Sequence, residues 1–384
     1  MHILEIPTFL PPYGGMFCID QARVLKNHGH EVRVLCCQQL GITIYPRHYV
    51  TAPFRRFWKE IDGIEIYFTN MRGIPILTHL NQKKWCRIVC QLFEDYITLH
   101  GKPDIIHAHC AQWAGVAARI ISRKTGIPYF ITEHLSAGMY SGKHLQWAKP
   151  FIREAYHDAE FVIPVAEELV SSLEPIFGKD YKWKEISNII DTDFFKPDIN
   201  SKKDSPTKSY RICCIANANK GFFYLKGYDV LAKAWEKLDS GLQLHIAGRD
   251  TDSRRMKKLF ANCKNVFLHG EMDKDGIRAL LYQSSALVLP SRSEVQPLVL
   301  LEAMATGLPV VSTEVTPKSE RIQGACFIAK TGDADSLAQK IDEVLQASVS
   351  PIQLHDAVAA IASPEVFYKK IHTLLLPYDN RGDE

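Results

Sequence analysis

The chain contains 384 residues, 46% of them hydrophobic and 23% charged, and carries a formal net charge of +3 at pH 7. This length allows two domains, each with its own core, and the composition is that of an ordinary globular protein. The net charge is too small to indicate a nucleic-acid partner. Residues 1–7 predict a strand followed by a turn and lack the features of a signal peptide. No apolar stretch is long enough to span a bilayer, so we expect a cytoplasmic protein.

Short β-rich runs alternate with longer helical patterns in the first half of the chain. Strands are predicted at residues 2–6, 31–37, 64–68, 104–108, 128–132 and 161–165, and helices near 14–29, 81–100, 112–125 and 143–158. This alternation indicates a parallel sheet with helices on both faces.

The second half begins after a polar segment without apolar periodicity, residues 198–209, which predicts an exposed loop near a domain junction. A second series of strands and helices follows from residue 210 to about 330. Helices are then predicted near 333–347, 350–361 and 366–376, the last with an apolar stripe.

Ten cysteines are distributed in a way that favours a structural role. The pairs 36–37 and 213–214 fall inside apolar strand runs, and Cys86 and Cys90 share one helix face. No CxxC pair occurs, so the spacing supports neither a zinc site nor a thioredoxin-like motif. We expect reduced, buried thiols.

Gly14 and Gly15 stand between the first strand and the first helix. Glycines at a helix start let backbone amides approach an anion closely, although a plain turn between strand and helix would also use them.

Glu294 and Glu302 lie eight residues apart in a segment that reads as strand, loop, helix and strand, framed by the apolar runs that end at Pro290 and begin at Leu308. Glu294 follows the first strand and Glu302 lies on the helix. Ligands of open α/β sheets bind beyond the carboxyl ends of the strands, and carboxylates accept hydrogen bonds from sugar hydroxyls. The alternative is a pair of solvated residues favoured by the helix dipole.

The spacing of these two glutamates and its apolar frame resemble the glutamate-x7-glutamate motif of retaining glycosyltransferases of the GT-B architecture, in particular family 4, the glycosyl transferases of group 1. Further segments match that family in the same order: 11–15, 104–109, 132–134, 188–191, 242–248, 265–270 and 286–291. Together the matches span roughly residues 2 to 320, and the ordered set is far more specific than any one of them.

The resemblance implies an α/β protein of GT-B architecture, with two Rossmann-like domains facing each other across a deep cleft. The acceptor-side domain would comprise residues 1–190 and the donor domain residues 191–365. Residues 366–384 would form a helix that crosses back to the first domain, as in that family, or a plain helix that caps the second.

The resemblance also implies roles for three catalytic residues. His134, at the end of a strand of the first domain, would face the anomeric centre of the donor sugar. Lys226, in a lysine-glycine pair, would neutralise the departing diphosphate, which suits a flexible ammonium group. Glu294 would lie near the transferred sugar and accept hydrogen bonds from its hydroxyls.

A wider set of residues is expected to bind substrate. Glu302 would hold the two ribose hydroxyls, backbone at Gly270 and Glu271 would read the base, and amides at the start of the helix after Glu294 would hold the phosphates. The expected set is Gly14, Gly15, His109, Lys220, Arg249, Gly270, Glu271, Val295, Gln296, Leu298 and Glu302.

Several positions depart from the family pattern. Residues 216–218 lack the usual phosphate-binding arginine, for which Lys220 would be the substitute, and Val295, Ile189 and residues 316–318 stand where glycines are common. These departures favour a non-catalytic nucleotide-sugar-binding subunit as one alternative. A GT-B isomerase of nucleotide sugars is another.

The function expected from the resemblance is transfer of a hexose, with retention, from a nucleotide sugar to a saccharide or lipid-linked saccharide in polysaccharide or glycan biosynthesis. We expect no cofactor and no metal ion, because lysine and amide dipoles supply the positive potential. A double displacement through Glu294 stays open as an alternative to front-face attack.

Two segments contain residues that could bind a metal ion. His107 and His109 share one strand face, but no third ligand with suitable spacing accompanies them, so we expect His109 to bind substrate hydroxyls instead. Residues 191–193 spell DxD, the metal-nucleotide motif of the other glycosyltransferase fold, but their place at the junction argues against that role.

Two basic and aromatic segments of the first half suggest a partner. One is residues 45–58 with Lys59, and the other contains Lys143, Trp147, Lys149 and Arg153. Such segments rest on anionic membranes, so we expect peripheral contact with the inner face of the cell membrane. The alternative is an acceptor-side loop with snorkelling cations.

Overall fold

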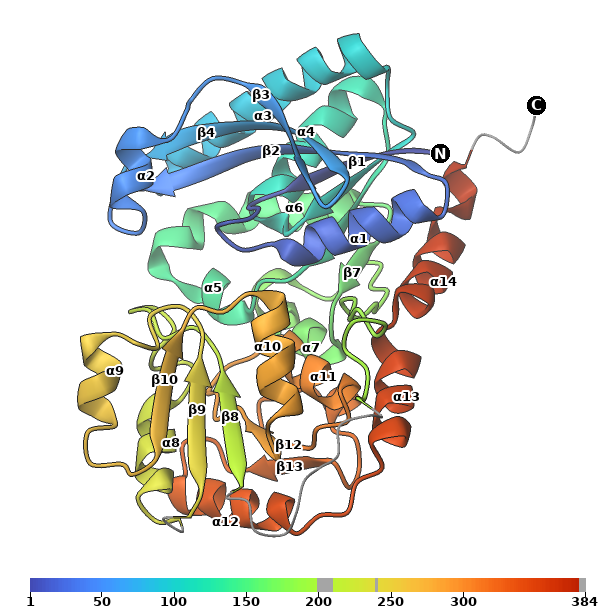
Figure 1. Ribbon diagram of the computed structural model, residues 1–384. Coiled ribbons are helices and arrows are strands. Elements are labelled where there is room, and N and C mark those ends of the chain that lie inside the picture. The colour runs from blue at the N-terminus through green and yellow to red at the C-terminus, as the bar shows by residue number, and fades with distance from the viewer. Residues whose placement is uncertain (199–209, 239–240, 380–384) are drawn as a thin grey trace. The chain divides into compact units, whose positions relative to one another are not determined.

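The computed structural model describes residues 1–198, 210–238 and 241–379 (Figure 1). The polar loop predicted at 198–209 lies outside the described residues from position 199 on. The chain divides into two compact units. Unit 1 consists of Met1–Ile189 together with the segment from Phe367 on, and unit 2 is Ile190–Val366.

Unit 1 is built on a seven-stranded sheet in the order β3-β4-β2-β1-β5-β6-β7. Its strands are β1 (His2–Pro7), β2 (Glu31–Gly41), β3 (Phe57–Ile61), β4 (Ile64–Gly73), β5 (Ile105–His109), β6 (Tyr129–Glu133) and β7 (Val162–Pro164). All neighbours are parallel except β3 and β4, which are antiparallel. The six strands predicted in this half are therefore present.

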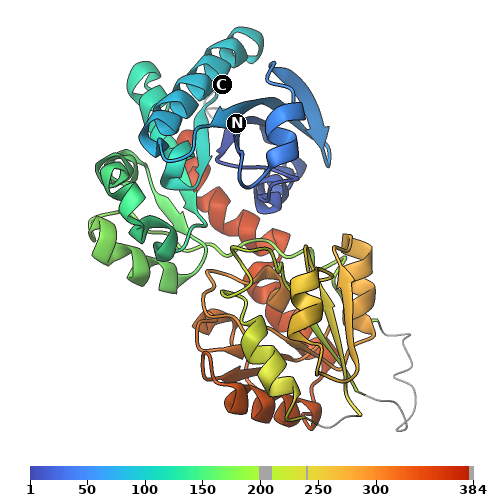
Figure 2. The same cartoon turned by 90° about the vertical axis from the view of Figure 1, so that its left-hand side faces the viewer.

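Helices cover both faces of this sheet. They are α1 (Met16–Asn27), α2 (Pro46–Thr51), α3 (Thr78–His100), α4 (Val116–Thr125), α5 (Ala137–Ser141), α6 (Lys149–Asp158) and α7 (Glu167–Phe177), with the short turns η1 (Ala111–Gly115) and η2 (Lys143–Ala148). Val34 and Cys36 of β2 belong to the core that contains the buried face of α1. On the opposite face, Trp85 of α3 donates to the Cys37 carbonyl at 2.6 Å. Figures 1 and 2 show α1 and α3 on the two sides of the sheet.

The segment at 45–58 is more ordered than the sequence indicated. It contains α2 and then leads into β3, an edge strand whose residues alternate between half-buried and exposed. Arg56 forms an ion pair with Asp95 of α3. Part of the positive charge ascribed to a membrane contact thus serves the fold. The strand was missed because five residues with two charges give a weak period-2 signal.

Unit 2 contains a six-stranded parallel sheet in the order β10-β9-β8-β11-β12-β13. The strands are β8 (Arg211–Ile215), β9 (Gln243–Ala247), β10 (Val266–Gly270), β11 (Ala286–Val288), β12 (Val310–Thr313) and β13 (Cys326–Ala329). The helices are α8 (Tyr228–Trp235), α9 (Arg254–Leu259), α10 (Lys274–Tyr282), α11 (Leu298–Ala305), α12 (Ala334–Leu345) and α13 (Pro351–Ala362), with the turn η3 (Lys318–Glu320).

Alternation along β8 separates two cores in unit 2. Ile212 and Cys214 pack with α8 and α12, whereas Cys213 and Ile215 pack with α10, α11 and α13. A strand buried on both faces must be apolar throughout, which explains the apolar run that carries two cysteines. All ten cysteines of the chain are free thiols, and those at 36–37 and 213–214 are buried, as predicted.

The last helix, α14 (Pro364–Leu375), begins in unit 2 and packs in unit 1. Phe367, Ile371 and Leu375 are buried in the core that also contains α1, and the turn η4 (Leu376–Tyr378) follows. Tyr368 stacks on His28 with ring centroids 3.5 Å apart.

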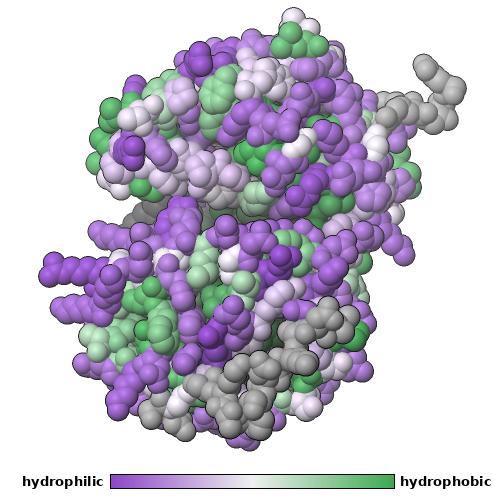
Figure 3. Space-filling model, in the orientation of Figure 1, coloured by the Kyte–Doolittle hydropathy of each residue, from purple (hydrophilic) through white to green (hydrophobic). Residues whose placement is uncertain are grey.

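The surface is mostly hydrophilic on the face shown in Figure 3, with small scattered hydrophobic patches. Among the described residues, every helix is too short or too polar to cross a membrane.

Replacing Ile371 by Ala should destabilise unit 1. The side chain is fully buried, and removing three carbons from a packed core leaves a cavity that lowers the free energy of unfolding by about 2–5 kcal/mol. Urea denaturation measures this change. Thr373→Ala, on the exposed side of the same helix, is the matched control and should stay within about 0.5 kcal/mol of the wild type. Equal midpoints for both variants would contradict the packing of α14.

Candidate active site

A pocket of about 360 Å³ lies at the carboxyl ends of β8, β9 and β10 in unit 2. Three predicted residues, Lys226, Arg249 and Glu271, line it, and Gly270 directly precedes Glu271. The three strands are parallel, so their ends meet at one edge of the sheet (Figure 1). This edge is where open α/β sheets bind their ligands.

Two glycines allow the loops around this pocket to approach one another. Gly248 follows β9 with φ 131°, and a Cβ there would lie 2.3 Å from the carbonyl oxygen of Ala216. Gly227 has φ 68°, and a Cβ there would lie 1.9 Å from the carbonyl oxygen of Pro290. Any other residue would push these loops apart. Gly227 therefore fixes the position of Lys226 beside the end of β11.

Lys226 and Glu294 form an ion pair. The Nζ atom lies 2.6 Å from Oε1 of Glu294, and the hydroxyl of Ser291 donates to the same oxygen at 2.5 Å. The side chains are 20% and 8% exposed, so water screens the pair only partly. An ammonium group has three N–H donors and a carboxylate has two acceptor oxygens, so both groups keep capacity for an anionic, hydroxyl-rich ligand.

Asn217 connects two loops where the family usually has an arginine nearby. Its side-chain oxygen accepts the backbone N–H of Arg249 at 3.1 Å, and the Arg249 carbonyl accepts the N–H of Ala218 at 2.8 Å. The Arg249 guanidinium lies 3.2 Å from a Glu271 oxygen. Arg249 is therefore a cation held at the pocket, whereas Lys220 is exposed and is not among the residues that line it.

Glu302 is half-buried on α11, the helix that follows Glu294. No side chain caps this helix, which begins at Leu298 after Val295, Gln296 and Pro297. The first N–H groups of an α-helix have no acceptor within the helix and attract anions. The predicted phosphate-binding amides thus stand at a helix start.

In unit 1, Gly15 is the N-cap of α1 with φ 79°, and a Cβ at this position would lie 2.4 Å from the carbonyl oxygen of Phe9. Gly14 is exposed with φ 109°. Both glycines are thus required by the tight turn from β1 into α1, whether or not a ligand contacts them.

A buried carboxylate that the sequence reasoning missed organises the histidines of unit 1. Glu5 of β1 is the register partner of His107 in β5. One of its oxygens, Oε2, lies 2.8 Å from Nδ1 of His107 and 2.6 Å from Nε2 of His109. Burial alone would raise the pKa of Glu5, but the charges and hydrogen bonds of the two histidines lower it to about 2. The signal was an acidic residue inside an otherwise apolar strand.

Glu5 is the third possible metal ligand that the sequence seemed to lack, since its carboxylate and the two imidazoles have ligand atoms within 4.8 Å of one another. The contact of His109 with the carboxylate is a hydrogen bond, and His107 lies within ion-pair distance of the same oxygen. His107 also contacts the hydroxyl of Thr132 through Nε2 at 2.7 Å. We interpret the cluster as a hydrogen-bonded network.

The network continues to His134. Nδ1 of His109 lies 3.3 Å from Nε2 of His134. An ionised Glu5 can only accept, so His109 donates to it through Nε2. The other ring nitrogen of His109, Nδ1, faces His134. His109 is itself buried, and its contact with substrate hydroxyls stays a prediction.

Further contacts hold His134 in place. Its ring stacks on Phe17 with centroids 3.8 Å apart. Burial, followed by the neighbouring histidines, lowers the pKa of His134 well below its ordinary value, so the ring is neutral near pH 7. The buried carboxylate of Glu133 accepts the backbone N–H of His134 at 3.0 Å and the hydroxyl of Tyr156 at 2.6 Å.

Acid should destabilise the folded protein through His107. Burial, partly opposed by Glu5, lowers the pKa of His107 from 6.5 to about 4. Between these pH values the unfolded chain binds a proton that the folded chain does not, so the free energy of unfolding falls as the pH drops from 6.5 to 4. His134 acts in the same direction. The contribution of His107 alone is on the order of 3 kcal/mol.

Urea midpoints measured from pH 7 to 4.5 test this expectation. His107→Gln should flatten the pH dependence, and His157→Gln, exposed on α6, should leave it unchanged. A wild-type midpoint that does not move over this range would contradict a neutral His107.

Comparison with known proteins identifies the family. The family profile described as glycosyl transferases group 1 matches residues 209–347, and that of the glycosyl transferase 4-like domain matches residues 17–188. A protein of Bacillus subtilis (strain 168) assigned as a teichuronic acid biosynthesis glycosyltransferase is 25% identical over 356 residues, 87% of this chain and 86% of its own length. An uncharacterized glycosyltransferase of Methanocaldococcus jannaschii is 27% identical over 375 residues, 90% of this chain and 89% of its own length.

Solved structures agree with this assignment at the level of the fold. Sucrose-phosphate synthase from Thermosynechococcus elongatus superimposes with a TM-score of 0.78 at 17% identity, over 98% of each chain. The Anabaena protein HepE, solved in complex with UDP and glucose, superimposes with a TM-score of 0.72 at 18% identity, over 98% of this chain and all of its own. The chain belongs to the group 1, family 4 glycosyltransferases and has their fold, GT-B with two Rossmann-like domains.

Proposed function

We propose that this glycosyltransferase of glycan biosynthesis transfers a hexose from a nucleoside diphosphate sugar, with retention of the anomeric configuration. The acceptor is a saccharide or a lipid-linked saccharide. The observation that carries the proposal is the pairing of Lys226 with Glu294 beside the strand-end pocket of unit 2. A cation for a diphosphate and a carboxylate for sugar hydroxyls are there held side by side.

Comparison with solved relatives supports the donor class. HepE of Anabaena has been solved with UDP-glucose, at 17% identity to this chain. In this chain the pocket, Glu302 and the start of α11 would accommodate the nucleoside and the diphosphate. His134, which contacts His109, would bind a hydroxyl of the donor sugar.

The chemistry proposed is departure of the diphosphate with attack of the acceptor hydroxyl on the same face of the sugar. Lys226, Arg249 and the first amides of α11 stabilise the negative charge that develops on the leaving group. The acceptor proton passes to a phosphate oxygen. Two donors, the ammonium of Lys226 and the hydroxyl of Ser291, already hold the Oε1 atom of Glu294, which favours a hydrogen-bonding role over a nucleophilic one.

No metal ion or other cofactor has a role in this proposal. The positive potential comes from side chains and amides, which act strongly in a site that excludes water. The DxD sequence at 191–193 supports this view. Asp191 pairs with Lys274 at 3.0 Å and accepts the backbone N–H of Phe194 at 3.0 Å, so its carboxylate is used within unit 2.

Replacing Lys226 by Met should lower kcat for donor hydrolysis or sugar transfer by about 10²–10³-fold, because a preorganised charge on the leaving group is lost. Lys233→Met, exposed on α8, is the matched control and should retain wild-type rates. Release of nucleoside diphosphate measures the reaction, after thermal stabilisation by UDP, ADP and GDP has selected the base. A Lys226→Met enzyme within threefold of the wild type would exclude the proposed role.

Stereochemistry and metal dependence provide a separate test. The product should keep the anomeric configuration of the donor in proton NMR spectra, and EDTA should change the rate by less than about twofold because side chains supply the charge. An inverted product, or loss of activity in EDTA that magnesium or manganese restores, would overturn the mechanism. A wild-type protein that binds nucleotide but never turns over would instead support a binding subunit.

A further inference from the structure

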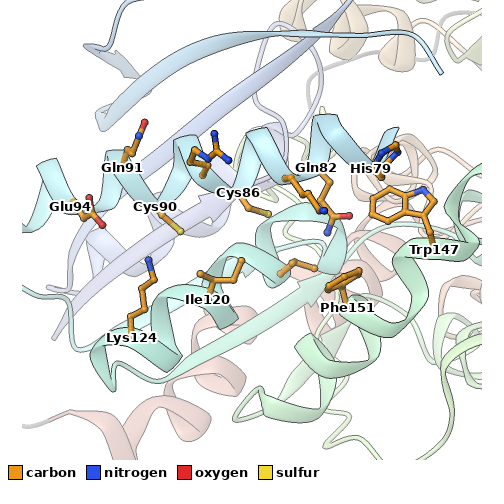
Figure 4. Close-up of a pocket in the computed structure, with 13 residues that line it drawn as sticks. His79, Gln82, Cys86, Cys90, Gln91, Glu94, Ile120, Lys124, Trp147 and Phe151 are labelled. Carbon is orange, nitrogen blue, oxygen red and sulfur yellow. The ribbon is translucent and has the colours of Figure 1, made fainter. Parts of the chain in front are cut away.

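A second cavity lies in unit 1 between α3, α4 and the segment η2–α6, and belongs to none of the sites described above (Figure 4). Its volume is about 970 Å³, at the upper end of what small-molecule sites show. Because helices rather than strand ends form it, it is separate from the glycine turn and the histidines of this unit. We call it the α3–α4 groove.

Apolar side chains form much of the α3–α4 groove. They are Cys86 and Cys90 of α3, Val116 and Ile120 of α4, Trp147 of η2 and Phe151 of α6. Burial, with a smaller contribution from Cys90, raises the pKa of Cys86 to about 12, so this thiol is neutral and behaves as a small hydrophobic group. Phe151 is 45% exposed in the open groove.

The aromatic end of the groove is preformed. The indole N–H of Trp147 donates to the hydroxyl of Thr78 at 3.1 Å, and its ring stacks on Trp113 with centroids 5.7 Å apart. Figure 4 shows Trp147 and Phe151 at one end, and Lys124 extending from α4 toward α3 at the other. Little side-chain ordering is therefore required for an apolar ligand to bind.

The cations that line the groove outnumber the acids. Lys83 and Arg87 of α3 and Lys124 of α4 line it, against the single acid Glu94. Within the described part of the chain, none of these three cations forms a hydrogen bond or an ion pair. Lys83 and Arg87 are also four residues apart on one helix, a spacing at which like charges repel. An anion bound between α3 and α4 would relieve this repulsion.

The geometry points to an anionic membrane phospholipid as the ligand of the α3–α4 groove. An aliphatic chain would lie on the apolar side chains, and the phosphate would be held by Lys83, Arg87 and Lys124. Each buried methylene favours binding, and each basic residue near an anionic bilayer adds to it. This inference rests on the proposed function and adds to it: the groove would hold the enzyme at the membrane surface, where a lipid-linked acceptor is found.

This assignment changes which segment contacts the membrane. Of the two basic and aromatic segments singled out in the sequence, residues 45–58 contribute α2, and Arg56 within them is paired with Asp95. The other supplies Trp147 to the groove, and Phe151 and Arg153 follow it on α6. The side chain of Lys143 lies outside the described residues.

Flotation of the full chain with vesicles tests the inference. The wild type should float with vesicles of phosphatidylcholine and phosphatidylglycerol in a two-to-one ratio, and not with phosphatidylcholine alone. The triple variant Lys83→Gln, Arg87→Gln, Lys124→Gln should partition at least tenfold less. Phe151→Asp should also lose binding, since it places a carboxylate on the apolar side. Lys179→Gln, Lys182→Gln, Lys184→Gln, exposed cations of the same unit, form the matched control and should bind as the wild type.

Three results would overturn the inference. The first is no flotation of the wild type with anionic vesicles, and the second is equal flotation of the groove variants and the control. The third is full competition by inorganic phosphate, which has no aliphatic chain. Donor hydrolysis and nucleotide-induced thermal stabilisation, measured on the same variants, should not change. If the wild type floats but never hydrolyses a donor, the proposed function fails and the groove assignment stands. If it turns over donor but does not float, the groove assignment fails alone.

Discussion

Burial of both faces of each parallel sheet is the constraint on which this structure depends. A strand covered by helices on two sides has no place for polar side chains except at its ends. In unit 2, Lys226, Arg249, Glu271 and Glu294 each follow a strand, β8 to β11, and so reach the same edge of the sheet. The charged side chains predicted to bind substrate in this unit thus lie just beyond the carboxyl ends of its strands.

Unit 1 differs, because it has a charged side chain inside its core. Glu5 is fully buried, and an isolated carboxylate there would be strongly unfavourable. Two imidazoles from the neighbouring strand β5 stabilise it, and one of them, His109, also contacts His134. Unit 2 thus carries its charged groups at the edge of its sheet, whereas in unit 1 a buried network contacts His134 from the core.

Local signals explain what the sequence could predict. The strands of unit 1 other than β3, the helix after Glu294 and the glycine turn at 14–15 each depend on a few adjacent residues, and all were predicted. The role of Glu5 was not, because it depends on the register between β1 and β5, about a hundred residues apart in the chain. Asn217 likewise appeared only as a missing arginine. Its bridge to Arg249 becomes visible once two loops are folded together.

The path of α14 has a mechanical consequence. The chain passes between the units at residues 189–190 and again within this helix, whose later turns are buried in the core of unit 1. The two units are therefore connected by two segments of the backbone rather than one. A protease that cuts at the first crossing would leave both fragments tethered, so limited digestion followed by gel filtration under native conditions would still yield a particle of undiminished mass. Residues 1–189 expressed alone would lack α14, so the hydrophobic side chains of unit 1 that this helix covers would be exposed to water.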